Sequence, residues 1–127
     1  MKILFKTLCD LAFTSSENGK LNIIGIFDDI LASAFPVTHP KMSLVMIVED
    51  EPGKEFKYHF DISDSSGKKL IDTSSTPSSA RISLNGKINI VLNVNLLTFN
   101  FEGVYTINFH TGKTKETLEF AVKNRNK

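Results

Sequence analysis

The stretch NGKLNIIGIFDDI, residues 18–30, decides the fold class. It opens on an Asn-Gly pair, a turn signal typical of β-hairpins, and runs through large apolar residues to two aspartates. Adjacent side chains on a strand point to opposite faces, so Asp28 and Asp29 cannot form a paired acid–base site by themselves. We therefore interpret the stretch as a buried strand with an acidic end, and not as the floor of an active site.

The same signals recur along the whole chain. Apolar residues alternate at period two in short runs, separated by turns rich in Gly, Pro, Asn and Ser, and no window shows sustained helical spacing. The expected strands are 2–13, 20–28, 42–49, 55–63, 68–72, 80–85, 87–99, 103–110 and 116–123. Short strands without crossover helices predict an all-β fold. We expect an antiparallel Greek-key sandwich, immunoglobulin-like, with about 8–9 strands in a single domain over residues 1–127.

Three details of the pattern predict local geometry. The inward-facing set of the strand at 87–99 changes parity at Leu96 and Leu97, which indicates a bulge or bend there. Tyr105 lies near the start of an expected strand and could donate its hydroxyl to a nearby carbonyl, as tyrosine corners do. The strands at 20–28 and 42–49 are apolar on both parities, so we expect both in the centre of their sheets.

Composition narrows the classes of function. The chain has 127 residues, 41% of them hydrophobic, and a net charge of +1 at pH 7. Balanced charge argues against nucleic acid as the main partner, and the absence of Trp argues against carbohydrate. Lys6 and Asp10 break the apolar N-terminal run, so no signal peptide is expected, nor any integral membrane segment. One cysteine allows no internal disulfide, and we expect a cytoplasmic protein.

Residues that could carry catalysis are few. Cys9 alternates with apolar residues, which predicts a buried, inert thiol. His39, His59 and His110 have no metal-ligand spacing. We expect that the protein is not an enzyme and that it has no catalytic residues and no cofactor. A small hydrolase stays open as a second alternative, and it would need two histidines to converge on a carboxylate or on Cys9.

Aspartates near the ends of strands leave another alternative open. Asp28, Asp29, Asp61 and Asp64 all lie in such positions. Sandwiches of the C2 type bind calcium with loop aspartates, and calcium takes six to eight oxygen ligands. These four residues would be the ligands of a C2-like calcium or membrane-surface binding module. The competing interpretation is that they end strands and form ordinary turns.

Two segments could meet a protein partner. In ASAFPVTHP, residues 32–40, two prolines stiffen the chain. It is either a rigid connection with Phe35 in the core or a surface loop that presents Phe35, Val37 and His39. The polar face of the strand at 55–63 offers Lys57 and His59. We predict a non-enzymatic protein-interaction or self-assembly module, binding a protein partner or forming a homo-oligomer through these residues or an exposed strand edge.

A resemblance rests on several segments taken together. They are LCDLAF (8–13), NGKLNIIGIFDDI (18–30), FPVTHPKMSLVMIV (35–48) and the G-x-Y-x-I pattern at 103–107. The combination resembles a family of small prokaryotic and phage-associated proteins described as a domain of unknown function. The resemblance implies an unexported, single-domain β-sandwich and brings no catalytic residues with it.

Overall fold

The computed structural model describes residues 1–17 and 19–126, and Asn18 of the expected hairpin turn lies outside the described residues. The described residues form ten strands: β1 (Lys2–Thr14), β2 (Leu21–Ile26), β3 (Asp29–Ala32), β4 (Val37–Glu49), β5 (Glu55–Ser63), β6 (Lys69–Asp72), β7 (Ser78–Arg81), β8 (Lys87–Phe99), β9 (Gly103–Thr111) and β10 (Thr114–Asn124). In this part of the chain there is no helix that could span a membrane.

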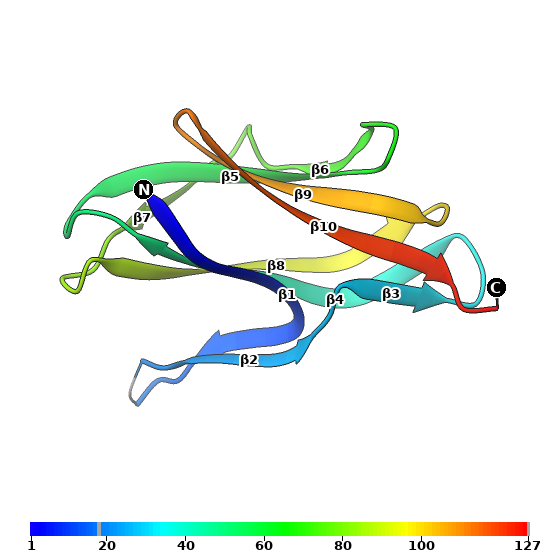
Figure 1. Ribbon diagram of the computed structural model, residues 1–127, viewed down its shortest axis with the longest axis horizontal. Helices are drawn as coiled ribbons and strands as arrows, with labels where there is room; N and C mark the ends of the chain where they lie inside the picture. Colours follow the sequence, from blue (N-terminus) through cyan, green and yellow to red (C-terminus); the bar gives the residue numbers. More distant parts are fainter. Residues whose placement is uncertain (18, 127) are drawn as a thin grey trace.

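The strands form two facing sheets, which confirms an all-β sandwich (Figure 1). One sheet has the order β2-β1-β4-β8. The other has the order β3-β10-β9-β5-β6, and β7 pairs with β5 beside β6. The second sheet is mixed and not purely antiparallel, because β3 runs parallel to β10.

Two differences from the expected strands have a physical reason. The strand β3 was missed because it is short and follows the two aspartates that indicated a loop. The strand β4 begins at Val37 and not at residue 42, so residues 37–41 are paired with β8 and do not form a surface loop. Pro40 can lie in this strand because β1 pairs with β4 only as far as Ser43, so that β4 has an open edge at Pro40.

The core lies between the two sheets. Buried side chains of β4 and β8 meet those of β5, β9 and β10, and the largest of them include Tyr105, Phe99 and Phe109. The edge of the Phe99 ring meets Tyr105, with the ring centroids 4.8 Å apart. The core therefore joins strands from the middle and the end of the chain.

The predicted change of parity occurs at Leu96. This residue has φ of +56°, and its side chain is 71% exposed, whereas Leu97 is buried. The register of β4 with β8 places Leu96 opposite Pro40, and the pairing keeps the same register on both sides of that position. Both strands thus exchange their inward and outward faces at one point, and β8 stays in its sheet and does not cross to the other.

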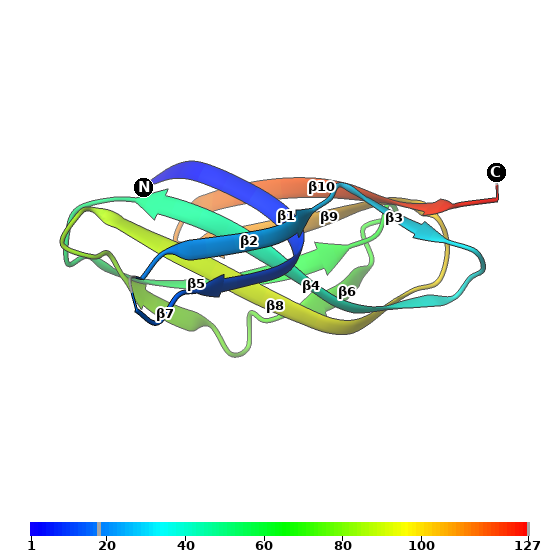
Figure 2. The ribbon, with the colours of Figure 1, turned by 90° about the horizontal axis from the view of Figure 1, so that it is seen from below.

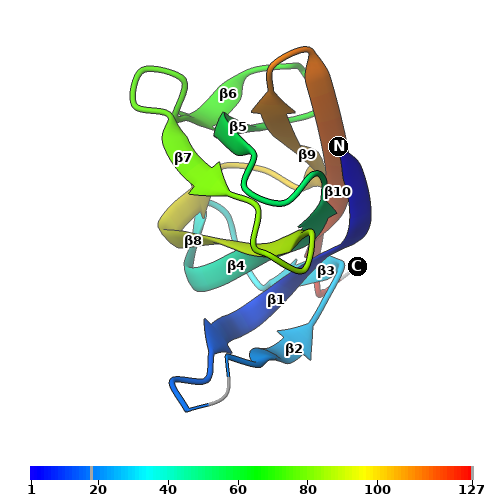
Figure 3. The ribbon, with the colours of Figure 1, turned by 90° about the vertical axis from the view of Figure 1, so that its left-hand side faces the viewer.

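The first strand bends so that its second half leaves the sandwich. The β1–β2 hairpin lies across the outer face of β4 and β8 as a third layer (Figures 2 and 3). There it closes a second, small core of Cys9, Ala12 and Val45, with Ile23 and Val91 packed against it. The expectation that residues 20–28 form a central strand was wrong, because β2 is the edge strand of its sheet. Its inner face is apolar because it covers this second core.

Candidate functional site

The β1–β2 hairpin presents a second apolar face, opposite to the face that covers the small core. Across the hairpin, Leu11 is paired with Ile24 on this face, whereas Ile26 is paired with the buried Cys9. The side chains of Ile24 and Ile26 are 52% and 63% exposed, and that of Phe13 is 45% exposed. We call the apolar surface formed by Leu11, Phe13 and Ile24, together with the exposed Ile26 that follows on β2, the hairpin face. Several large apolar side chains on one exposed face are typical of an interaction surface.

The edge of β2 adds unpaired backbone to this apolar face. Among the described residues β2 pairs with β1 alone, and Leu21–Ile26 contains no charged residue. Edge strands are usually protected by charges or by a local kink. The kink is present here: Gly25 has φ of +72°, and a Cβ atom at this position would lie 2.3 Å from Asp10 Oδ2. The edge is therefore open over the residues before Gly25.

The hairpin face was missed from the sequence for a clear reason. A strand that is apolar on both parities was assigned to the centre of a sheet, where both faces are covered. In the structure, one face of β2 covers the small core and the other faces solvent. The signal available in the sequence was that residues 21–26 are apolar on both parities and that Gly25 interrupts this run.

A polar network crosses the outer face of the other sheet. Asp61 is buried, and its Oδ1 accepts a hydrogen bond of 2.9 Å from Asn108 Nδ2. Its Oδ2 lies 2.7 Å from His110 Nε2. The hydroxyl of Thr117 donates to Asn108 Oδ1 at 3.1 Å, and His59 stacks on His110 with the ring centroids 4.6 Å apart. Neighbouring strands thus fix one carboxylate and two imidazoles in place.

This network has the convergence that the hydrolase alternative required, because His59 and His110 meet beside Asp61. The hydroxyls close to it have other partners. Thr117 donates to Asn108, and Thr111 Oγ1 donates to the carbonyl of Lys57 at 2.8 Å. Within the described residues no side-chain hydroxyl is hydrogen-bonded to either imidazole. The hydrogen bonds with Asn108 and His110 satisfy the carboxylate of Asp61. A hydrolase stays a prediction.

The aspartates of the calcium alternative have separate partners. Asp29 forms an ion pair with Lys123 at 3.0 Å, and Asp28 is exposed just before β3. Asp64 Oδ1 accepts hydrogen bonds from the backbone of Ser66 and Lys68, which is ordinary turn geometry. Hydrogen bonding from Ser66 lowers the pKa of Asp64. In the described part of the chain no group of three or more acidic, histidine or cysteine side chains could hold a metal ion.

The residues predicted to meet a partner are divided between two places. Phe35 and Val37 are partly buried and pack against the main core, and the Phe35–Pro36 peptide bond is cis. The ring centroids of His39 and Phe27 are 5.9 Å apart, and the buried Nε2 of His39 has no hydrogen-bond partner among the described residues. Lys57 is exposed on β5, two residues from His59. The structure therefore does not bring these residues together on one surface.

The thiol of Cys9 is buried, as predicted. It lies in the small core, and its Sγ donates towards the carbonyl of Leu11 at 3.5 Å. Burial raises the pKa of this thiol above its ordinary value. A protonated, enclosed thiol is a poor nucleophile.

Comparisons with known proteins place the chain in a family. One similar solved structure is the alkylpurine DNA glycosylase AlkC of Pseudomonas fluorescens, bound to DNA that contains an abasic-site analogue. The match has 10% sequence identity and a TM-score of 0.49, and it covers 93% of this chain but 30% of the glycosylase chain. A likeness this distant carries no argument about function. A search of curated proteins finds no match. A model of the family of unknown function DUF6941 matches residues 4–123, and the chain belongs to this family.

Proposed function

We propose that the protein is a non-enzymatic interaction module that associates with a second copy of itself through the hairpin face. The exposed apolar side chains of Ile24 and Ile26 beside the open edge of β2 carry this proposal. A large apolar side chain stabilises a complex by about 1.5–3 kcal/mol when it becomes fully buried. Four such side chains on one small hairpin favour a covered face.

A second copy suits this surface because an edge strand is complementary to itself. Two β2 strands can pair antiparallel about a twofold axis, so that each supplies the backbone groups that the other leaves unpaired. No charged side chain lies within Leu21–Ile26, so this pairing does not place like charges opposite each other. The kink at Gly25 limits the paired length, which favours a closed dimer over continued growth of the sheet.

Two finer expectations accompany the proposal. The hydroxyl of Tyr105 donates to the carbonyl of Phe101 at 2.6 Å, which supports an immunoglobulin-like Greek-key topology. The buried, reduced Cys9 suits a cytoplasmic protein.

Sedimentation velocity across a wide range of protein concentrations tests the proposal. We expect the wild type to form a dimer and the Ile24→Ser, Ile26→Ser variant to remain monomeric. Phe101→Ser is the matched control, because Phe101 is 53% exposed but lies in the turn between β8 and β9. The Phe101→Ser variant should form a dimer over the same concentration range as the wild type. A wild type that is monomeric at every concentration would overturn self-association.

A different protein partner is the other possible occupant of the hairpin face. Affinity capture with the wild type, the Ile24→Ser, Ile26→Ser variant and Phe101→Ser distinguishes such a partner from a second copy. A partner that binds monomeric wild type and is lost from the Ile24→Ser, Ile26→Ser variant would replace the second copy as the occupant.

A further inference from the structure

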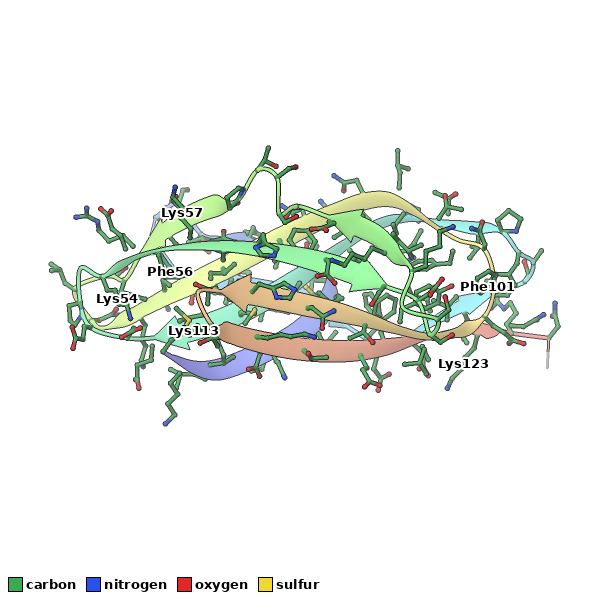
Figure 4. All side chains as sticks on the ribbon, turned by 90° about the horizontal axis from the view of Figure 1, so that it is seen from above. Lys54, Phe56, Lys57, Phe101, Lys113 and Lys123 are labelled. Atoms are coloured by element: carbon green, nitrogen blue, oxygen red, sulfur yellow. The ribbon has the colours of Figure 1, made fainter. Side chains whose placement is uncertain are left out.

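A cationic hollow lies at the end of the sandwich where β5 begins and β9 turns into β10. Its volume is about 480 Å³, and it is lined by Met1, Lys54, Phe56, Lys57 and the turn at 111–114. Figure 4 shows Lys54, Phe56, Lys57 and Lys113 gathered at this end, far from Phe101 and Lys123. Three lysines and no carboxylate line the hollow.

Two of these lysines carry charge without compensation. Lys54 shares the carboxylate of Asp50 with the amino group of Met1, at distances of 2.9 and 3.5 Å. Within the described part of the chain, the side chains of Lys57 and Lys113 have neither an ion-pair nor a hydrogen-bond partner. Two free ammonium groups beside one hollow attract an anion.

The two walls of the hollow, β5 and the turn after β9, are joined by hydrogen bonds. The ladder between β5 and β9 reaches His59 and His110, and beyond it Thr111 Oγ1 donates to the carbonyl of Lys57. This hydroxyl is buried, since Thr111 is 8% exposed. Gly112 forms the tip of the opposite wall, and a Cβ atom there would have no neighbour within 4 Å. A ligand therefore meets a fixed wall and an unobstructed turn.

Phe56 supplies the apolar part of the site. Its ring is partly buried against the core, and it also lines a neighbouring hollow of about 540 Å³. Lys57 lines both hollows as well. A ligand can thus place its anionic group near Lys57 and Lys113 and its body against Phe56. Both volumes lie within the range of small-molecule sites, about 300–1,000 Å³.

We propose that this hollow binds a small phosphate ester, with the phosphate between Lys57 and Lys113 and an apolar or aromatic body against Phe56. Two cations match the double charge of a phosphate monoester better than the single charge of a carboxylate, and lysine is a common phosphate ligand. The site is separate from the hairpin face and does not depend on self-association.

Calorimetric titration with adenosine monophosphate, inorganic phosphate and adenosine tests the proposal. We expect adenosine monophosphate to bind, inorganic phosphate to bind more weakly, and adenosine not to bind. The Lys57→Gln, Lys113→Gln variant should bind adenosine monophosphate at least tenfold more weakly. Lys115→Gln is the control, because Lys115 is exposed on β10 but does not line the hollow. It should change the affinity less than twofold.

Two results would overturn the proposal. One is a wild type that binds neither anion; the other is a double variant that binds adenosine monophosphate as tightly as the wild type. Phe56→Leu separates the two parts of the ligand, since it keeps an apolar side chain in the core. This variant should bind adenosine monophosphate only as weakly as the wild type binds inorganic phosphate. Melting curves of each variant confirm that the fold is intact.

Discussion

Tyr105 shows how single residues resolve the conflict between burial and polarity. The side chain is 2% exposed, yet its hydroxyl donates a hydrogen bond to the carbonyl of Phe101. Burial raises the pKa of Tyr105 above its ordinary value, so the hydroxyl remains a donor at neutral pH. This bond joins the start of β9 to the turn before it.

Removing this hydroxyl should cost about 1 kcal/mol of the free energy of unfolding, because one buried hydrogen bond is lost and the ring remains. The change is Tyr105→Phe, and denaturant unfolding measures it. Tyr58→Phe is the control, since the Tyr58 ring stacks on Phe109 but its hydroxyl has no hydrogen-bond partner among the described residues. Equal losses for both variants would contradict the role given to the Tyr105 hydroxyl.

Acid sensitivity is also set by single residues. Hydrogen bonding from Ser74, with a smaller contribution from Lys69, lowers the pKa of Asp72 to about 2. The unfolded chain binds this proton at the ordinary pKa of about 3.9. The carboxylate therefore stabilises the fold above that pH, and its contribution is lost as the pH falls towards 2.

Unfolding midpoints at a series of pH values check this sign. The Asp72→Asn variant should lose stability less steeply than the wild type as the pH falls from about 4 to about 2. Asp28→Asn serves as a control at an exposed carboxyl. Parallel profiles for Asp72→Asn and the wild type would show that Asp72 does not contribute.

At the scale of elements, the exchange of faces in β4 and β8 depends on one backbone conformation. Leu96 adopts φ of +56°, a left-handed conformation that disfavours a branched side chain, and it gains little burial in return. Glycine adopts this conformation without steric cost.

Leu96→Gly should therefore raise the free energy of unfolding by about 0.5 kcal/mol, the relief of strain exceeding the added freedom of the unfolded chain. Leu97→Gly should lower it by more than about 3 kcal/mol, because a buried side chain is lost. Chemical denaturation compares the two. If both variants are destabilised alike, the left-handed position does not set the exchange of faces.

The alternating pattern of the sequence predicted most elements, because each sandwich strand with one wet face carries a period of two. The strands β5 and β8 have the predicted bounds, and the Tyr105 hydrogen bond is confirmed. At the predicted change of parity the chain has a left-handed residue, Leu96. The edge position of β2 could not be predicted, since the pattern does not say which layer covers an apolar face. Proximity of His59, His110 and Asp61 depends on strand register, which one sequence does not reveal.

At the scale of the whole molecule, a sandwich of two sheets carries a third layer on one side. The β1–β2 hairpin covers part of β4 and β8 (Figure 3). Its outer apolar side chains are exposed. Membership of a family of unknown function agrees with the expected resemblance, and a prokaryotic or phage-associated origin stays a prediction. We propose that the outer face of this layer is covered by a second molecule.

Hydrogen exchange of the β2 amides at low and high protein concentration tests whether a second copy covers this layer. Amides within Leu21–Ile24 should become protected at high concentration, because a second β2 strand pairs with the open edge. Amides of β9, in the interior of its sheet, should exchange at the same rate at both concentrations. If protection in β2 does not change with concentration, this edge is not where two copies meet.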